Sequence, residues 1–324
     1  MANMDANHKE IKVPWRWRFK AWWEGYDVAD MEARLRARGG KASYKELTQK
    51  EPEPPAEPVE KVNWDALRIE VSQLIWGDGY CGPGGPENVV AMSKLLALSP
   101  KHSAMVIGAG LGGPARVLAQ EFGVWINGYE SSAKLAAAGM EMSKKAGLEK
   151  KAPIYHQDLE NIEAFERNFD RALAKEALFT VRRKNNLLKV VHTHLKDDSL
   201  FLITDYVIRD MDSLQHPDVQ QWLSQEPHDP HPVTSDMMVQ SLEKAGFRIR
   251  VNEDITEHYL DMIAEAWATA DQVVKLLSRQ GPEASDSLNA IMREAQFWNR
   301  RTKIMRSGEL KVCRYLAHKP AVIR

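Results

Sequence analysis

The residues with the clearest chemical potential are the closely spaced glycines of Val106-Ile107-Gly108-Ala109-Gly110-Leu111-Gly112-Gly113. They follow a short apolar run and precede a segment with helical spacing, so they lie where a strand turns into a helix. Gly108 and Gly110 permit a tight turn and a close approach of a ligand to the backbone. The helix N-terminus that follows offers free N–H groups and a partial positive charge. The sequence therefore predicts a ligand-binding loop at this turn.

An acidic residue stands at the matching place on the next predicted strand. Glu130 ends that strand, 22 residues after Gly108. A carboxylate there can accept hydrogen bonds from both ribose hydroxyls of an adenosine cofactor. Gly108, Gly110 and Gly113 also satisfy the GxGxxG pattern, so NAD and S-adenosylmethionine (SAM) both stay open on this motif alone. A glycine turn that serves only packing is disfavoured, because strand, loop, helix, strand and acid occur in order.

A sheet has to hold these residues, and the hydrophobic pattern predicts one. Helices are expected near residues 66–76, 87–98, 114–122, 131–147, 187–196 and 235–246. Strands are expected near residues 103–110, 124–130, 152–158, 169–174, 199–207, 247–254 and 309–319. Strands that alternate with helices predict an α/β fold with a doubly wound, mostly parallel sheet. Before the last strand we expect a helical insertion at about 256–305.

The front of the chain is set apart by its aromatic residues. Four of the 10 tryptophans lie close together: Trp15, Trp17, Trp22 and Trp23. The segment EPEPPAEPVE after it is rich in proline, which fixes φ and removes amide donors, so a semi-rigid linker is expected. We therefore predict a Trp-rich helical extension at 1–50, a Pro/Glu-rich linker at 51–62 and one catalytic domain at 63–324.

Two roles stay open for the extension. Trp and Arg are favoured anchors at interfaces, so it could dock on the catalytic domain or join a homodimer. Aromatic rings beside basic side chains also suit the headgroup level of a membrane, which gives residues 13–26 a peripheral membrane role. Acidic residues follow soon after, among them Glu24, Asp27 and Asp30. This mixed charge favours docking or dimerisation over membrane contact.

Composition limits the class of protein further. The chain has 44 basic and 45 acidic residues, which gives no reason to expect a nucleic-acid partner. Two cysteines, Cys81 and Cys313, exclude a disulfide-rich scaffold and a four-cysteine zinc site. His228 and His231 lack a third convergent ligand, so no metal site is expected. Without a long apolar run or a signal-peptide pattern, a cytoplasmic location is expected.

Taken in order, the motifs resemble the class I SAM-dependent methyltransferases, and among them the phosphoethanolamine and sarcosine/dimethylglycine N-methyltransferase type. The likeness runs from about Leu67 to the C-terminus. One anchor is the segment IWGDGYCGPGG, which is similar to the family's lid. The others are the glycine loop, Gly128-Tyr129-Glu130, and LITDY at 202–206 after Leu195-Lys196.

The resemblance implies a seven-stranded, Rossmann-like core, SAM as cofactor and methyl transfer as the activity. It implies that Asp158, after the third strand, reaches the adenine amino group, and that Leu159 packs on the adenine ring. The full set of implied cofactor residues is Trp76, Gly108, Gly110, Gly113, Glu130, Ser131, Asp158 and Leu159. Tyr80 in the lid and Tyr206 at the strand end are implied to face the acceptor.

The departures from that family concern the acceptor. Ser72 and Thr180 stand where phosphoethanolamine enzymes have a catalytic tyrosine and histidine. Residues 221–228 lack the arginine of their phosphate clamp, and a phosphate dianion without such donors is poorly held. We therefore expect a different small-molecule or lipid-like acceptor, methylated on N, O, S or C. Its pocket should be formed by the lid, Tyr206, residues 221–232 and the 256–305 helices.

His228, in a proline-rich stretch after the fifth strand, is a candidate base or acceptor contact, with a plain polar loop as the alternative. Two other functions also stay open. An NAD-dependent oxidoreductase would use the same glycine loop and Glu130, but it would not explain the WGDGY lid or the TDY strand end. A non-catalytic SAM-fold assembly partner is favoured slightly by the degraded turn at 195–199 and disfavoured by the intact glycine loop.

Overall fold

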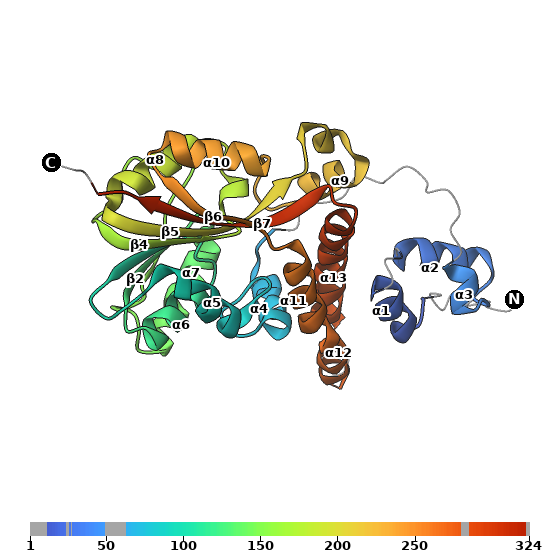
Figure 1. The fold of residues 1–324 in the computed structure, drawn as a ribbon. Coiled ribbons are helices and arrows are strands. Elements are labelled where there is room, and N and C mark those ends of the chain that lie inside the picture. Colours follow the sequence, from blue (N-terminus) through green and yellow to red (C-terminus); the bar gives the residue numbers. More distant parts are fainter. Residues whose placement is uncertain (1–11, 24–25, 27, 49–62, 280–284, 322–324) are drawn as a thin grey trace, which may run out of the picture.

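The computed structural model describes residues 12–23, 26, 28–48, 63–279 and 285–321. The predicted linker at 51–62 lies outside these residues. Figure 1 shows one twisted sheet with helices on both of its faces. The seven strands are β1 (Ser103–Ile107), β2 (Trp125–Glu130), β3 (Ile154–His156), β4 (Phe169–Lys175), β5 (Leu195–Ile208), β6 (Arg248–Asp254) and β7 (Leu310–Lys319).

The strand order is β3-β2-β1-β4-β5-β7-β6. Strands β1 to β5 pair in parallel, and β7 runs antiparallel to both β5 and β6. The order reverses between β1 and β4, and ligands of open α/β sheets bind in the crevice at such a switch point. The mostly parallel seven-stranded sheet predicted from the sequence is confirmed.

The two faces of the sheet bury two separate sets of apolar side chains, as β1 illustrates. Ala104 and Val106 face one hydrophobic cluster, and Met105 and Ile107 face the other, because side chains alternate along a strand. The first face is covered by α4 (Ala66–Trp76), α5 (Gly85–Ser93), α6 (Gly113–Glu121) and α7 (Ala133–Lys145). The second is covered by α8 (Lys184–His194) and α10 (Ser235–Lys244).

The C-terminal half adds helices at the carboxyl ends of the parallel strands, as Figure 1 shows. The predicted insertion is present as α11 (Thr256–Ala268), α12 (Ala270–Ser278) and α13 (Ser285–Arg306). One helix was not predicted: α9 (Pro217–Gln225) covers part of the expected 221–232 loop. Its cap is His216, whose side chain accepts from the N–H of Asp218 at 3.3 Å, and histidine is not among the residues that signal a helix start.

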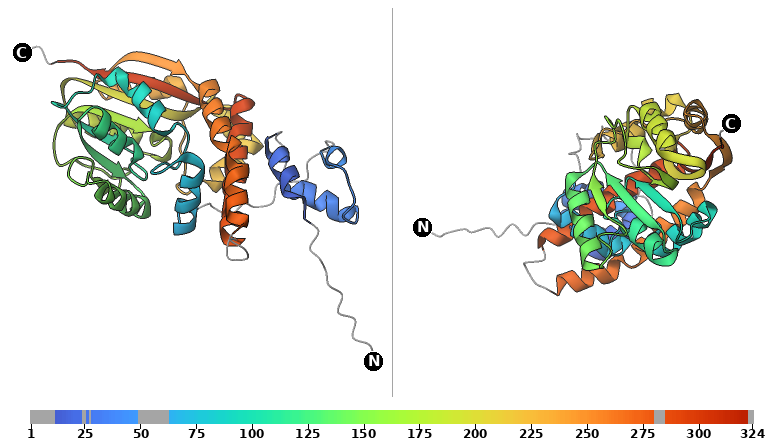
Figure 2. Two further views of the ribbon diagram at one scale, coloured as in Figure 1. Left: turned by 90° about the horizontal axis from the view of Figure 1, so that it is seen from below. Right: turned by 90° about the vertical axis from the view of Figure 1, so that its left-hand side faces the viewer.

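The N-terminal extension contains α1 (Trp15–Trp23), α2 (Val28–Ala37) and α3 (Tyr44–Leu47). These helices share a small apolar cluster that includes Met31 and Leu47, and Met292 of α13 packs against it. Trp15 also donates its indole N–H to Asp271 of α12 at 3.3 Å. Figure 2 shows these three helices beyond α13, on the side away from the sheet. None of the described helices combines the length and apolar character that crossing a bilayer requires.

Candidate active site

A pocket lies at the carboxyl ends of β1, β2, β4 and β5, next to the switch point. Its walls come from the glycine loop, the lid after α4, the segment after β4, the segment after α9, and helices α11 and α13. The lid, Tyr206 and the 256–305 helices, which the sequence assigned to the acceptor pocket, all line it. From the predicted 221–232 loop, residues 226–228 line it as well. One end of the pocket is mainly backbone, and the other is mainly aromatic side chains.

The glycine loop forms the backbone end. Gly108 has a φ of 69°, which favours glycine, and a Cβ there would lie 2.3 Å from the Cβ of Ala177. The N–H groups of Gly108 and Ala109 both donate to the carbonyl of Tyr129, at 2.9 and 3.1 Å. These bonds fix the turn against β2, so the loop backbone is held in place beside the pocket.

Glu130 is the buried acid of this end, at 7% exposure. Its carboxylate accepts from the backbone N–H of Gly110 and of Ser132, each at 2.8 Å. Burial raises the pKa of Glu130, and the hydrogen bonds from Ser132 and Gly110 oppose that rise. A carboxylate offers about four acceptor sites, so lone pairs remain for a ligand. This arrangement fits the two ribose hydroxyls of an adenosine cofactor.

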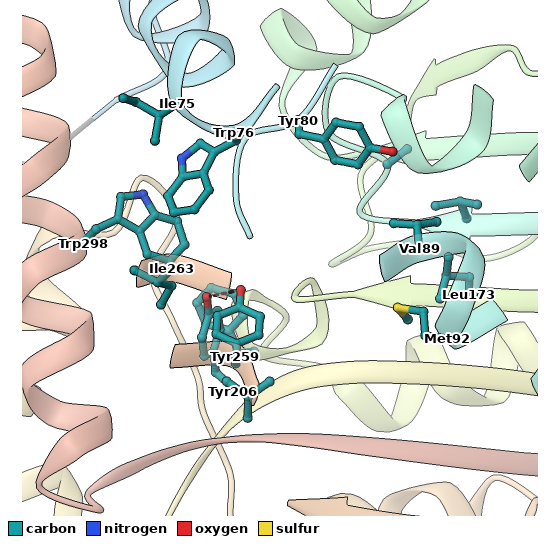
Figure 3. Packing of buried hydrophobic residues seen from close by; sticks show 14 of the residues in the cluster. Ile75, Trp76, Tyr80, Val89, Met92, Leu173, Tyr206, Tyr259, Ile263 and Trp298 are labelled. Carbon is teal, nitrogen blue, oxygen red and sulfur yellow. Dashed lines mark hydrogen bonds between the residues drawn. The ribbon is translucent and has the colours of Figure 1, made fainter. Parts of the chain in front are cut away.

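The lid crosses the N-terminus of α6, and Gly113 makes the crossing possible. The N–H of Gly113 donates to the carbonyl of Gly79 at 3.0 Å, and a Cβ on Gly113 would lie 2.5 Å from that oxygen. Within the described part of the chain, the buried hydroxyl of Tyr80 has no hydrogen-bond partner. Figure 3 shows this hydroxyl pointing away from Tyr206 and Tyr259. Tyr80 and Tyr206 therefore line the same pocket without facing one another.

The aromatic end is built around two buried tyrosines. The hydroxyls of Tyr206 on β5 and Tyr259 on α11 lie 2.8 Å apart, as Figure 3 shows. Burial raises the pKa of both phenols, so they stay protonated near neutral pH. The Arg301 guanidinium donates to the Tyr206 hydroxyl at 3.1 Å and lies 4.7 Å from the ring centre of Trp298. The rings of this wall therefore already hold one cation, the guanidinium of Arg301.

Arg301 is neutralised by Glu226, the first residue after α9. The Nε of Arg301 donates to Glu226 Oε1 at 3.0 Å, and its Nη2 contacts the same oxygen. The indole N–H of Trp222 donates to that oxygen as well, at 2.5 Å. Residues 221–228 contain no arginine, as noted from the sequence, but α13 places Arg301 beside Glu226. Neither Arg301 nor Glu226 was identified from the sequence, because the two residues are 75 positions apart.

A second carboxylate lies at the end of β4. Glu176 lines the pocket with a φ of 46°, a left-handed conformation that side-chain-bearing residues seldom adopt. Thr204 donates its hydroxyl to Glu176 Oε1 at 2.8 Å, and Lys175 pairs with the other oxygen. Strained residues of this kind concentrate at active sites. A Lys-Glu pair directly after a buried strand was the available signal, and the sequence interpretation looked instead at Thr180.

The structure thus places eight of the eleven predicted site residues on the pocket wall: Tyr80, Gly108, Gly110, Glu130, Ser131, Leu159, Tyr206 and His228. Trp76 lies behind the wall, with its ring centre 4.6 Å from that of Trp298. Gly113 lies outside the pocket wall and holds the lid through the hydrogen bond from its N–H to the carbonyl of Gly79. Asp158 is exposed and accepts from the N–H groups of Glu160 and Asn161 at 3.0 and 3.2 Å, as a turn former does.

Comparison with known proteins bears on this site. A family model described as mycolic acid cyclopropane synthetase matches residues 88–283. Phosphoethanolamine N-methyltransferase 3 of Arabidopsis thaliana is 23% identical over 205 residues, which are 63% of this chain and 41% of that protein. The chain thus spans about two fifths of the length of this curated relative.

Two solved structures extend the comparison to the fold. Haemonchus contortus phosphoethanolamine N-methyltransferase 2 in complex with S-adenosyl-L-methionine matches with a TM-score of 0.65 and 22% identity, covering 78% of this chain and 56% of that one. The cyclopropane synthase MmaA2 from Mycobacterium tuberculosis matches with a TM-score of 0.65 and 16% identity, covering 79% and 94%. Both have the fold class predicted from the sequence.

Proposed function

Because this chain belongs to the mycolic acid cyclopropane synthetase family, a family of SAM-dependent methyltransferases, we propose that it transfers a methyl group from SAM to a small-molecule or lipid-like acceptor. The observation that carries the proposal is the buried Glu130 carboxylate beside the glycine loop, with an aromatic chamber in the same pocket. The family favours SAM over NAD as the ligand of this loop.

In the proposed complex the chain's own residues hold the cofactor by its adenosine part. Glu130 accepts hydrogen bonds from the ribose hydroxyls, and the bare backbone at Gly108 and Gly110 leaves room for the rest of the molecule. Leu159, which is 3% exposed, lines the pocket and offers an apolar contact for the adenine ring. SAM supplies a methyl group that its positive sulfur already activates. The remaining work is alignment of the acceptor and exclusion of water.

The aromatic end does this work in our proposal. Tyr206, Tyr259 and Trp298 give the acceptor a rigid wall that excludes water, and the Glu226–Arg301 pair fixes that wall. An acceptor that loses a proton needs a base. The two phenols are unsuited, because burial raises their pKa values and keeps them protonated near neutral pH. We assign the proton to Glu176, with His228 as the alternative, since both line the pocket.

The N-terminal extension and the assembly state belong to the same proposal. We propose that residues 1–50 dock on the catalytic domain at 63–324, supported by the contact of Trp15 with Asp271 and by Met292 against the N-terminal cluster. The homodimer, the cytoplasmic location and membrane contact through residues 13–26 stay predictions of the sequence. Within that segment, the side chains of Trp22 and Trp23 lie outside the described residues.

Two measurements test the proposed function. Titration calorimetry with S-adenosylhomocysteine (SAH) and with NADH should show saturable binding of SAH alone, and tight NADH binding without SAH binding would contradict the proposal. Methyl-labelled SAM is then incubated with metabolite and lipid extracts. Label in a product supports methyl transfer and identifies the acceptor. SAH binding without any labelled product would favour the non-catalytic assembly partner instead.

A further inference from the structure

A second groove lies outside the candidate active site, on the face of the molecule that carries α8 and α10. It is bounded by the start of α8, the segment before α9, and the segment that leads into α10. Four basic side chains line it: Arg182, Arg183, Lys184 and His231. No acidic residue is among the described residues that line it. The proposed methyl transfer makes no use of this groove.

Two of the basic side chains of the groove, Lys184 and Arg183, are held by contacts with neighbouring residues. Lys184 is 4% exposed, and its ammonium group donates to the carbonyl of Val181 at 2.7 Å and to the carbonyl of His231. Arg183 pairs with Glu160 at the rim, at 3.4 Å. Arg182 is exposed and forms no ion pair with the residues that the structure describes. Arg182 therefore gives the described part of the groove a positive charge that solvent can reach, whereas Lys184 is attracted by the buried carboxylate of Asp205 and by Glu160.

Apolar side chains lie beside these charges. Leu214, Leu223, Val233 and Met237 line the groove, and Met237 is 38% exposed. The start of α8 bears a partial positive charge, and the Glu160 carboxylate accepts there from the N–H of Arg182 at 2.7 Å and of Arg183 at 3.2 Å. A basic end next to an apolar floor matches one kind of ligand, namely an anion that carries a hydrocarbon chain.

The groove shares a wall with the candidate active site. Glu226, Pro227 and His228 line the active-site pocket, whereas Pro230 and His231 line the groove. A backbone hydrogen bond joins the two sides of this wall: the N–H of His231 donates to the carbonyl of Phe179, a residue of the active-site pocket, at 2.6 Å. A ligand in the groove would contact the segment that carries His228, although it would not enter the pocket.

We propose that this groove is a second ligand site, which binds an amphipathic phosphate monoester with its phosphate at Arg182 and His231 and its chain over Met237. Phosphate is favoured because several converging donors suit its oxygens, and arginine contacts them well. The site is distinct from the cofactor pocket, so its occupancy is independent of whether the proposed methyl transfer is correct.

The test uses hexyl phosphate as the probe, titrated into the full chain with SAH present at saturation. We expect saturable binding, weakened about tenfold or more by Arg182→Glu at low salt. The matched control is Arg248→Glu, an exposed arginine on β6 outside the groove, which should leave the affinity unchanged. Both positions are on the surface, so neither change should unfold the chain, and thermal melting checks this.

Two further arms separate the sources of binding. Inorganic phosphate should bind more weakly than hexyl phosphate. Met237→Ser should weaken the binding of hexyl phosphate and leave the binding of inorganic phosphate unchanged. Hexyltrimethylammonium should not bind. No saturable binding of hexyl phosphate, equal binding of hexyltrimethylammonium, or insensitivity to Arg182→Glu would overturn the site. Intact SAH binding in the same samples would leave the proposed function standing even if the groove fails. Lost SAH binding with hexyl phosphate still bound would contradict the proposed function and leave the groove site standing.

The pH dependence gives a check that a nonspecific apolar contact would not pass. Burial lowers the pKa of His231, and Lys184 and Arg182 lower it further, whereas Glu160 and Asp229 oppose them. A bound dianion favours the protonated imidazole, whereas hexyl phosphate itself takes up a proton at about pH 6. The ratio of the affinity of the unaltered chain to that of His231→Asn should therefore rise as the pH falls through the pKa of His231. A profile that stays the same in this variant would contradict the placement of the phosphate beside His231.

Discussion

The two ends of the candidate active site are built in different ways. The cofactor end depends on backbone: the turn at Gly108, the N–H groups that hold Glu130, and the crossing of the lid over Gly113. The acceptor end depends on side chains from separate helices, with Glu226 and Arg301 at its centre. The residues of the cofactor end lie within a short segment of the sequence, whereas those of the acceptor end are far apart in the sequence. Substitutions at the two ends should therefore differ in their effects on SAH binding and on the free energy of unfolding.

The largest effect is expected from unpairing Arg301 at the acceptor end. The side chains of Glu226 and Arg301 are 3% and 8% exposed, so Glu226→Leu leaves a buried charge without its partner. Loss of one partner of a buried pair costs about 3–5 kcal/mol of unfolding free energy. Urea unfolding measures it. The double variant Glu226→Leu/Arg301→Met should recover much of the loss, and equal stability of the single variant and the unaltered chain would refute the pairing.

The next largest effect is expected at the cofactor end, from Gly108→Ala. The added Cβ meets the Ala177 Cβ at 2.3 Å in a backbone conformation that favours glycine, so the turn has to move. Backbone strain of this kind costs about 1–3 kcal/mol, and displacement of the loop should remove SAH binding. Gly147→Ala is the matched control, because Gly147 also has a positive φ but has open space around it. SAH affinity equal to that of the control would mean that the loop does not bind the cofactor.

A smaller and more selective effect is expected from Tyr206→Phe. The change removes the hydroxyl that joins Arg301 and Tyr259 and leaves the ring in place. Loss of these bonds should lower the unfolding free energy by about 1–3 kcal/mol, while SAH affinity stays within about twofold. Tyr155→Phe, at an exposed tyrosine on β3, should do neither. A large loss of SAH affinity in Tyr206→Phe would show that the two ends are not separable.

The smallest effect is expected from Asp158→Ala. The resemblance assigns Asp158 to the adenine, but its carboxylate is exposed and accepts from its own loop. We expect SAH affinity to fall by less than about threefold, since only the turn is weakened. A tenfold loss in titration calorimetry would restore the predicted contact with the cofactor.

The contrast between the two ends also explains how much the sequence could tell. Strands, most helices and the glycine loop follow from local periodicity, and Gly108 and Glu130 were placed from a short segment. The helix at 217–225 was missed because His216 is an unusual cap. Glu226, Tyr259 and Arg301 were missed because no local pattern joins them, and only the folded chain brings them together. The resemblance assigned Trp76 to the cofactor, which stays a prediction, and the structure shows its ring packed against Trp298 of α13.

The most direct test of the central claim is the affinity of SAH for Glu130→Gln as a function of pH. Burial raises the pKa of Glu130, and the ribose hydroxyls donate more strongly to its carboxylate form than to the protonated acid. Affinity of the unaltered chain should therefore fall as the pH falls through that pKa. Glu130→Gln should bind about tenfold or more weakly at neutral pH, with a flat profile. The exposed Glu163→Gln should match the unaltered chain. Equal SAH affinity in Glu130→Gln and the unaltered chain, at every pH, would contradict a cofactor site at this carboxylate.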